Sequence, residues 1–170
     1  SGSSVVPGAY SVKLTLGDVT ATASVAVKSD PRVKLTQADY QANYDHGKKI
    51  QALTNTANES VKRIRAAKRD ADAIKAMAKA AMEADGADKD MLKALVKKAC
   101  ALSKSLKANE KTYFIERKSA EGIQYTGDKV MTKIRGARGN IGDGAPGGAA
   151  LAYYAIAEKA LANGLAATNK

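Results

Sequence analysis

Apolar and polar residues alternate along the first part of the chain. Apolar side chains fall on every second residue, at Tyr10, Val12, Leu14 and Leu16 and again at Val19, Ala21, Ala23, Val25 and Val27. A period of two predicts strands, and Gly17-Asp18 between the two runs predicts a tight turn of a primed type. We therefore expect a β-hairpin over residues 9–29. Residues 1–8, which open with SGSS, are typical of a cloning remnant or a linker.

An isolated hairpin is marginally stable in water, so this one must pack against something. Three alternatives stay open at this point: the helices that follow it, a missing part of a β-sandwich, or another molecule. Asp30-Pro31 then marks a boundary, because a residue before proline disfavours the helical conformation.

After this boundary the apolar residues repeat with a helical period. Thr36 and Asp39 resemble a capping box, with Asp in place of the usual Glu or Gln. The following stripe is Tyr40, Tyr44, Gly47, Ile50, Leu53, Ala57, Val61, Ile64, Ala71, Ile74, Ala78 and Ala81. It predicts one helix over about 37–84, which at 1.5 Å per residue is about 70 Å long. Such a length favours the spine of an antiparallel coiled coil.

The segment ADGAD, residues 84–88, predicts a reversal of the chain. Gly86 suits the left-handed residue that ends a helix, and Asp88 suits the next N-cap. A second stripe with spacings of three and four then predicts a helix over 88–113. Its members are Leu92, Leu95, Ala99, Leu102, Leu106, Asn109 and Tyr113.

Two shorter helices are predicted towards the end of the chain, over 128–141 and 146–167. A bent helix end and a loop around Gly122 precede them, and Thr126 or Asp128 is expected to cap the first. The predicted fold is mainly α, with an N-terminal β-hairpin followed by an elongated antiparallel bundle of about four helices with coiled-coil-like packing. The side chains expected to hold the bundle together are Ile50, Leu53, Val61, Ile64, Leu92, Leu95, Leu102 and Leu106.

The composition suits this fold and narrows the chemistry. The chain has 170 residues, 45% of them hydrophobic but only 5% aromatic, which is typical of small aliphatic side chains packed between helices. No apolar run approaches the roughly 18 residues of a membrane span. The single Cys100 excludes an internal disulfide and a cysteine-rich zinc site.

The segment RGARGNIGDGAPGG, residues 135–148, holds six of the fourteen glycines and invites comparison with phosphate-binding loops. A P-loop needs a preceding strand and a Lys followed by Ser or Thr. Neither is present here, and the spacing of Gly142, Gly144 and Gly147 falls between predicted helices. We interpret the segment as a joint that loosens the third helix after Ile134, with Pro146 in the first turn of the fourth helix.

Other candidates for catalysis favour a structural interpretation. His46 is the only histidine, and its neighbour Asp45 points to a different helix face. We expect His46 to be hydrogen-bonded or exposed to solvent, and Cys100 to be a partly buried structural thiol. The carboxylate pairs Asp70–Asp72 and Asp88–Asp90 lie on charged helix faces. We therefore expect no catalytic, metal or cofactor site.

The formal net charge of +11 admits an anionic partner. Basic residues gather on the two long predicted helices, and the candidate patch consists of Lys62, Arg63, Arg65, Lys68, Arg69, Lys97, Lys104 and Lys111. Such stripes could follow the phosphates of a nucleic acid or an anionic surface polymer. The alternative is a solvated coiled-coil face, since stacking aromatic residues are absent and acidic residues interrupt the stripes.

Three stretches resemble a known family. The stretch VVPGAYSVKLTLGDVTATASVAVKSDPRVKLTQADYQANYD resembles the junction near the C-terminus of large bacterial secreted proteins with sortilin-like, glycosidase-type β-propeller repeats. There, a hairpin of this pattern closes an Ig- or fibronectin-like module and leads into a long helix. The family's later helices are similar to two further segments, NESVKRIRAAKRD and EGIQYTGDKVMTKIRGARGNIGDGAPGGAALAYYAIAEKAL. The resemblance therefore covers roughly residues 6–166.

The resemblance implies a C-terminal accessory region of a secreted, periplasmic or cell-surface protein. It carries over no catalytic residue, because glycosidase chemistry would belong to the propeller. We expect a non-enzymatic structural or protein-interaction module. A protein partner or a second copy would join at the hairpin edge or along the helix stripe, and the alternative is a basic module for nucleic acid or an anionic polymer.

Overall fold

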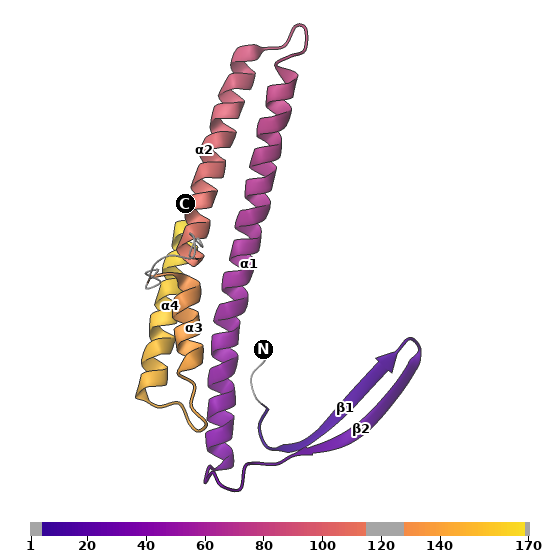
Figure 1. Ribbon diagram of the computed structural model, residues 1–170, viewed down its shortest axis with the longest axis vertical. Helices are drawn as coiled ribbons and strands as arrows, with labels where there is room; N and C mark the ends of the chain where they lie inside the picture. Colours follow the sequence, from indigo (N-terminus) through magenta and orange to yellow (C-terminus); the bar gives the residue numbers. More distant parts are fainter. Residues whose placement is uncertain (1–4, 115–127, 169–170) are drawn as a thin grey trace, which may run out of the picture.

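The computed structural model describes residues 5–114 and 128–168. It contains strands β1 (Gly8–Leu16) and β2 (Val19–Val27) and helices α1 (Gln37–Ala81), α2 (Lys89–Tyr113), α3 (Val130–Gly139) and α4 (Gly148–Thr168). The predicted fold class is confirmed: a two-stranded antiparallel hairpin precedes four helices. In Figure 1, α1 and α2 form a long arm, α3 and α4 lie beside the lower half of α1, and the hairpin projects from the base.

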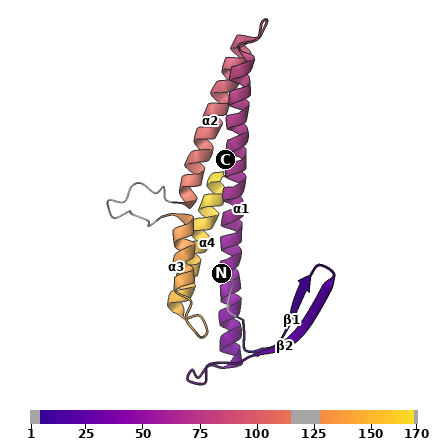
Figure 2. The same cartoon turned by 45° about the vertical axis from the view of Figure 1, so that its right-hand side comes forward.

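The two strands pair in register from Gly8 opposite Val27 to Leu16 opposite Val19. Gly17 has a φ of 58°, whereas Asp18 does not have a positive φ. These signs match a type II′ turn, so the predicted primed turn is present in the form that needs glycine only at its first central position. Figure 2 shows the curved hairpin standing clear of the helices.

Local signals at the ends of α1 and α2 act as the sequence predicts. The Asp39 backbone N–H donates to Thr36 Oγ1 over 3.2 Å, and the Thr36 N–H donates to Asp39 Oδ2 over 2.8 Å. At the reversal, Gly86 has a φ of 74° and Asp88 Oδ1 accepts from the Met91 N–H over 3.0 Å. The capping box, the left-handed glycine and the second N-cap are therefore confirmed.

The ends of the shorter helices differ from the expectation. Lys129 is the N-cap of α3 and makes no side-chain cap, so Asp128 does not cap this helix; it lies 3.7 Å from the Lys133 ammonium group instead. Thr126 and the loop around Gly122 lie outside the described residues. The Leu151 N–H donates to the Gly147 carbonyl, which places Pro146 before α4 rather than in its first turn. α3 also continues past Ile134 to Gly139.

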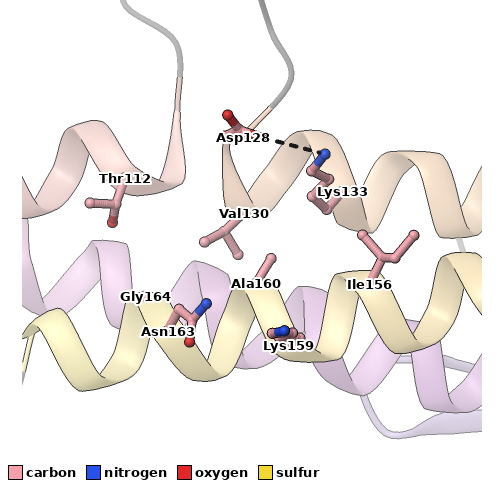
Figure 3. A pocket seen from close by; sticks show the side chains of 9 residues that line it. All are labelled: Thr112, Asp128, Val130, Lys133, Ile156, Lys159, Ala160, Asn163 and Gly164. Carbon is pink, nitrogen blue, oxygen red and sulfur yellow. Dashed lines mark ion pairs between the residues drawn. The ribbon is translucent and has the colours of Figure 1, made fainter.

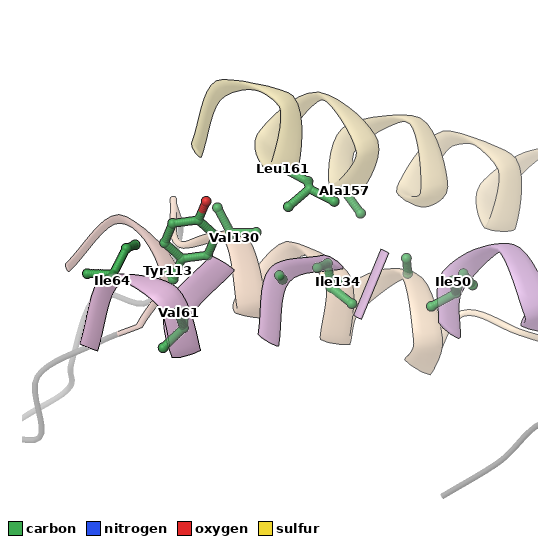
Figure 4. Packing of buried hydrophobic residues seen from close by; sticks show 10 residues of the cluster. Ile50, Val61, Ile64, Tyr113, Val130, Ile134, Ala157 and Leu161 are labelled. Atoms are coloured by element: carbon green, nitrogen blue, oxygen red, sulfur yellow. The ribbon is translucent and has the colours of Figure 1, made fainter. Parts of the chain in front are cut away.

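The hydrophobic core lies where α1, α3, α4 and the end of α2 meet (Figure 4). Its buried members are Ile50, Ala57, Val61, Ile64, Tyr113, Val130, Ile134, Ala137, Ala157 and Leu161. Gly164 lets α4 approach closely, because a Cβ there would lie 3.0 Å from Val130 Cγ2 and 3.3 Å from Tyr113 Cζ. The lower half of the molecule is thus a three-helix bundle in which α3 occupies the place that α2 holds above it.

Above this core, α1 and α2 meet along a seam with spacings of three and four. The seam residues are Val61, Ile64, Lys68, Ala71, Lys75 and Ala78 on α1 with its C-cap Met82, and Leu92, Val96, Ala99, Ser103, Leu106, Glu110 and Tyr113 on α2, all buried or half-buried. The predicted stripe on α2 was wrong at two of its seven members, and Asn109 is half-buried. The stripe is correct at Leu92, Ala99, Leu106 and Tyr113, but Leu95 and Leu102 are 40% and 51% exposed.

Polar contacts between α1 and α2 accompany the orientation of α2 in which Leu95 and Leu102 face outward. Glu110 Oε1 accepts from Arg65 Nε over 2.7 Å, and the Ser103 hydroxyl donates to Asp72 Oδ1 over 2.8 Å. Both contacts cross from one helix to the other, and both require Ser103 and Glu110 to face α1. On α1, the predicted Ile74 is likewise 40% exposed.

Candidate interaction surfaces

One face of the hairpin is apolar and uncovered. Directly opposed residues on paired strands point to the same face, so this face consists of Tyr10, Val12, Leu14, Leu16, Val19, Ala21, Ala23 and Val25. We call it the hairpin face. Leu14, Leu16 and Val19 are 70%, 82% and 73% exposed. The opposite face carries Ser11, Lys13, Thr15, Thr20, Thr22 and Ser24.

The hairpin touches the rest of the described chain only at its base. The Gln37 side chain donates to the Pro7 carbonyl over 3.1 Å, which ties the entry of β1 to the start of α1. Within the described residues, neither strand packs against a helix. Of the three alternatives for the hairpin, the structure thus removes packing on the described helices.

The residues of the candidate basic patch do not all lie together. In an antiparallel pair such as α1 and α2, the residues that come one position after each seam residue lie on the same side of both helices. This side carries Lys62, Arg65, Arg69, Lys97, Lys104 and Lys111, which we call the basic flank. Arg63 lies on the opposite flank, and Lys68 lies in the seam.

Acidic partners reduce the positive potential of this flank. Arg65 pairs with Glu110, and its guanidinium lies 5.7 Å from the centre of the Phe114 ring. Lys68 Nζ lies 2.6 Å from Asp72 Oδ2. Hydrogen bonds from Lys68 and Ser103, in that order, lower the pKa of Asp72 below its usual value. Arg65 therefore helps to hold α1 against α2, whereas the Lys68–Asp72 pair lies within α1 and engages the carboxylate that accepts from Ser103.

The opposite flank of the arm, which also carries Arg63, exposes five large apolar side chains. It carries Ile74 and Met77 of α1 and Met91, Leu95 and Leu102 of α2, which are between 40% and 64% exposed. We call these five residues the apolar flank. Sequence reasoning assigned Ile74, Leu95 and Leu102 to the core and so did not recognise this surface.

The glycine-rich segment is anchored to α1. The Asn43 side-chain amide donates to the carbonyl oxygens of Gly142 and Gly144, the latter over 2.9 Å. Leu35 packs against Gly144, where a Cβ would lie 2.9 Å from Leu35 Cδ2. The loop thus has a packed geometry set by residues about a hundred positions earlier in the chain.

Two clefts lie beside these elements. One of about 390 Å³ opens between the end of α2, α3 and α4 (Figure 3). Its polar side chains are Thr112, Asp128, Lys133, Lys159 and Asn163, and Asp128 pairs with Lys133. The other, of about 520 Å³, lies at the hairpin base between Val27, Tyr40, Tyr44 and the loop at Ile141. Neither cleft lining includes a histidine or a cysteine.

His46 is buried, contrary to the expectation of a satisfied or exposed histidine. It is 4% exposed, its ring centre lies 5.6 Å from that of Tyr154, and its Nε2 makes no hydrogen bond within the described part of the chain. Burial, and secondarily the charge of Lys49, lowers the pKa of His46. The imidazole is therefore neutral in the folded protein near neutral pH.

The remaining candidate residues are placed apart from one another. Cys100 is exposed on the basic flank, so the expectation of a partly buried thiol was wrong. Asp88 caps α2 and Asp72 is engaged by Lys68 and Ser103, so the carboxylate pairs serve the helices. Within residues 5–114 and 128–168, no group of three metal-binding side chains comes together.

Comparison with known proteins adds no relative: no family model, no curated protein and no solved structure matches the chain. Among the described helices, none combines the length and the apolar composition that crossing a membrane requires.

Proposed function

We propose that this chain is a non-enzymatic interaction module, an accessory region of a larger exported protein that docks through the hairpin face. The observation that carries the proposal is the exposure of Val12, Leu14, Leu16 and Val19 on a strand pair that packs against none of the described helices. Contiguous apolar surface of this kind marks interaction sites in soluble proteins.

The size of the hairpin face favours a β-sheet as the partner. Nine residues per strand and two strands give a face of about 30 by 10 Å, or about 300 Å². A stable interface needs about 800 Å² from each partner. Two hairpins packed face to face would fall well short of this area. A partner sheet that covers the face and also pairs with a strand edge adds main-chain hydrogen bonds.

The resemblance of the segment from Val5 to Asp45 to the end of an Ig- or fibronectin-like module is consistent with such a partner. In that arrangement the rest of the sandwich belongs to the same longer protein and precedes the hairpin. The genomic reading frame provides the first test. An export signal and a β-rich region upstream support the proposal, whereas a reading frame without either contradicts it.

Hydrogen exchange of the hairpin amides provides the direct test. In the chain of 170 residues, we expect these amides to exchange quickly, because an uncovered two-stranded hairpin is marginal. In the longer protein, we expect them to be protected. Leu14→Lys should remove this protection, whereas the matched variant Thr15→Lys on the opposite face should retain it. Equally rapid exchange in both proteins would refute docking through this face.

The proposal also assigns no catalytic turnover to this chain. Incubation of the purified chain with aryl glycosides of several configurations is the relevant assay, and hydrolysis above the buffer rate would contradict the assignment. A mixed set of substrates is appropriate because the resemblance names only the glycosidase class.

A second candidate function is binding of an anionic polymer, and the basic flank is the observation that favours it. Each phosphate or sulfate neutralised makes binding more salt-dependent. Four exposed residues of this flank, Lys62, Arg69, Lys97 and Lys104, should then contribute to a steep fall in affinity for DNA or heparin with salt. Their replacement by Gln should flatten this dependence. No binding at low salt would reject this candidate.

A further inference from the structure

The apolar flank continues a surface that α4 covers lower down the molecule. Met91 belongs to the same heptad row of α2 as Thr112, and Thr112 lines a cleft together with Asn163 and Lys159 of α4. On α1, Ile74 belongs to the same row as His46, whose ring meets Tyr154 of α4. The helix α4 therefore lies on this side of the α1–α2 pair.

This cover ends where α4 ends. Gly164 lies against Tyr113, and the hydroxyl oxygens of Tyr113 and Thr168 are 3.4 Å apart. In Figures 1 and 2, the C-terminal end of α4 lies beside the lower end of α2, and the arm extends well above it. The upper arm thus has the two-helix groove of the lower bundle with no described helix in it.

We infer that a second copy of this chain occupies the groove, with the two arms packed antiparallel through their apolar flanks. The exposed groove spans about 17 residues of α1, or about 25 Å, and is about 20 Å wide across two helices. The arm of a second copy has the same length and width, so the pair completes a four-helix bundle. The inference does not depend on the function proposed for the hairpin.

Steric exclusion selects the antiparallel orientation. If the tips of both arms pointed the same way, the base of the second copy would occupy the space of α4. With the tips opposed, the second arm ends beside the C-terminal end of α4, and its own base lies beyond the first tip. Only this orientation leaves α4 in place.

The charges of the arm favour the same orientation. The tip carries Glu83, Asp85, Asp88 and Asp90 against a single Lys89 between them. Arg63 and Asp70 both lie on the flank that faces the second copy, and Arg63 is the one near the level that the opposed tip reaches. Tips placed together would bring the acidic clusters side by side instead. Lys98 borders the flank, where its ammonium group can stay in water at the rim.

The area predicts a weak dimer. A footprint of about 25 by 20 Å on each copy buries about 1,000 Å² in total, at the lower limit for a specific interface. We therefore expect reversible association in the micromolar range. Sedimentation velocity over a hundredfold range of concentration should show the average mass rising from one chain towards two.

Two double variants test the flank. Leu95→Lys with Leu102→Lys should weaken association at least tenfold, because each copy would bury two ammonium groups. The matched control is Ala94→Lys with Ala101→Lys, which adds the same charges one residue earlier, on the outer face of α2, and should dimerise as the wild type does. Equal helical circular dichroism shows that both variants fold.

Cross-linking tests the orientation. On a Cys100→Ser background, Met77→Cys lies near the two-fold axis and should link to its counterpart with a short bismaleimide. Met91→Cys lies near the tip and should not. A wild-type chain that stays monomeric throughout overturns the inference, as does a dimer that persists in the Leu95→Lys, Leu102→Lys variant. Efficient linking through Met91→Cys would overturn the antiparallel orientation.

Discussion

Alanine substitutions at two helical glycines should change the free energy of unfolding in opposite directions. Gly164 of α4 packs against the buried Tyr113, and a Cβ there would lie 3.0 Å from Val130 Cγ2 and 3.4 Å from Tyr113 Oη. Gly136 of α3 is the matched position. A Cβ there would meet Tyr153 Cδ1 at 3.6 Å, which is an ordinary van der Waals contact.

The size of each change follows from two opposing contributions to the free energy of unfolding. Replacing a helical glycine by alanine stabilises a helix by about 1 kcal/mol. Adding a methyl group to a packed core costs about 1–3 kcal/mol. Both terms apply at Gly164, so Gly164→Ala should lower the free energy of unfolding by about 1 kcal/mol. Only the first applies at Gly136, so Gly136→Ala should raise it by up to about 1 kcal/mol.

Urea unfolding followed by circular dichroism at 222 nm measures both effects. The midpoints of the two variants should move in opposite directions, with slopes equal to that of the wild type. A Gly164→Ala variant as stable as Gly136→Ala would refute the close approach of α4 to Tyr113. It would also weaken the account of why α4 covers this flank at the base of the arm.

Three further predictions concern single contacts. His46 has a lowered pKa in the folded chain, so the unfolded chain takes up a proton more readily than the folded chain as the pH falls below about 6.5. The free energy of unfolding measured in urea should therefore fall less between pH 7.5 and 5.5 in His46→Leu than in the wild type. Equal losses in the two proteins would contradict the burial of a neutral imidazole. Asn43→Ala should lower the free energy of unfolding by about 1–2 kcal/mol, because it removes the donor to two loop carbonyls. Amide hydrogen exchange should become faster in residues 140–147 but not at the tip where α1 meets α2. Thr36→Ala should lower the free energy of unfolding by about 1 kcal/mol, because it removes the cap of α1, whereas Thr36→Ser should keep the melting temperature. A Thr36→Ala variant with the melting temperature of the wild type would count against the capping box.

The places where elements begin and end were largely readable from the sequence, because the signals that set them are local. A capping box spans four residues, and Gly86 and Asp88 stop one helix and start the next within three. The alternation from Tyr10 to Val27 likewise assigns strands and their two faces without reference to the rest of the chain. Asp128 misled because its carboxylate can pair with Lys133 as readily as it can cap α3.

The row of each helix that faces its neighbour was decided by the tertiary structure. On α2, the row of Leu92, Ala99 and Leu106 lies between two other rows of residues. One contains Leu95 and Leu102, and the other contains Val96, Ser103 and Glu110. Hydrophobicity alone favours the side with Leu95 and Leu102. The structure adopts the other side, where Ser103 and Glu110 meet Asp72 and Arg65, partners more than thirty residues away.

The chain by itself therefore determined the hairpin, its two faces, and the number, order and approximate extent of the helices. Tertiary packing alone decided that His46 is buried, that Cys100 is exposed, and that the glycine-rich loop is held by Asn43. It also decided that Leu95 and Leu102 face outward. The reason is physical: caps, turns and periodicity act between neighbours in the chain, whereas burial depends on which distant surfaces come into contact.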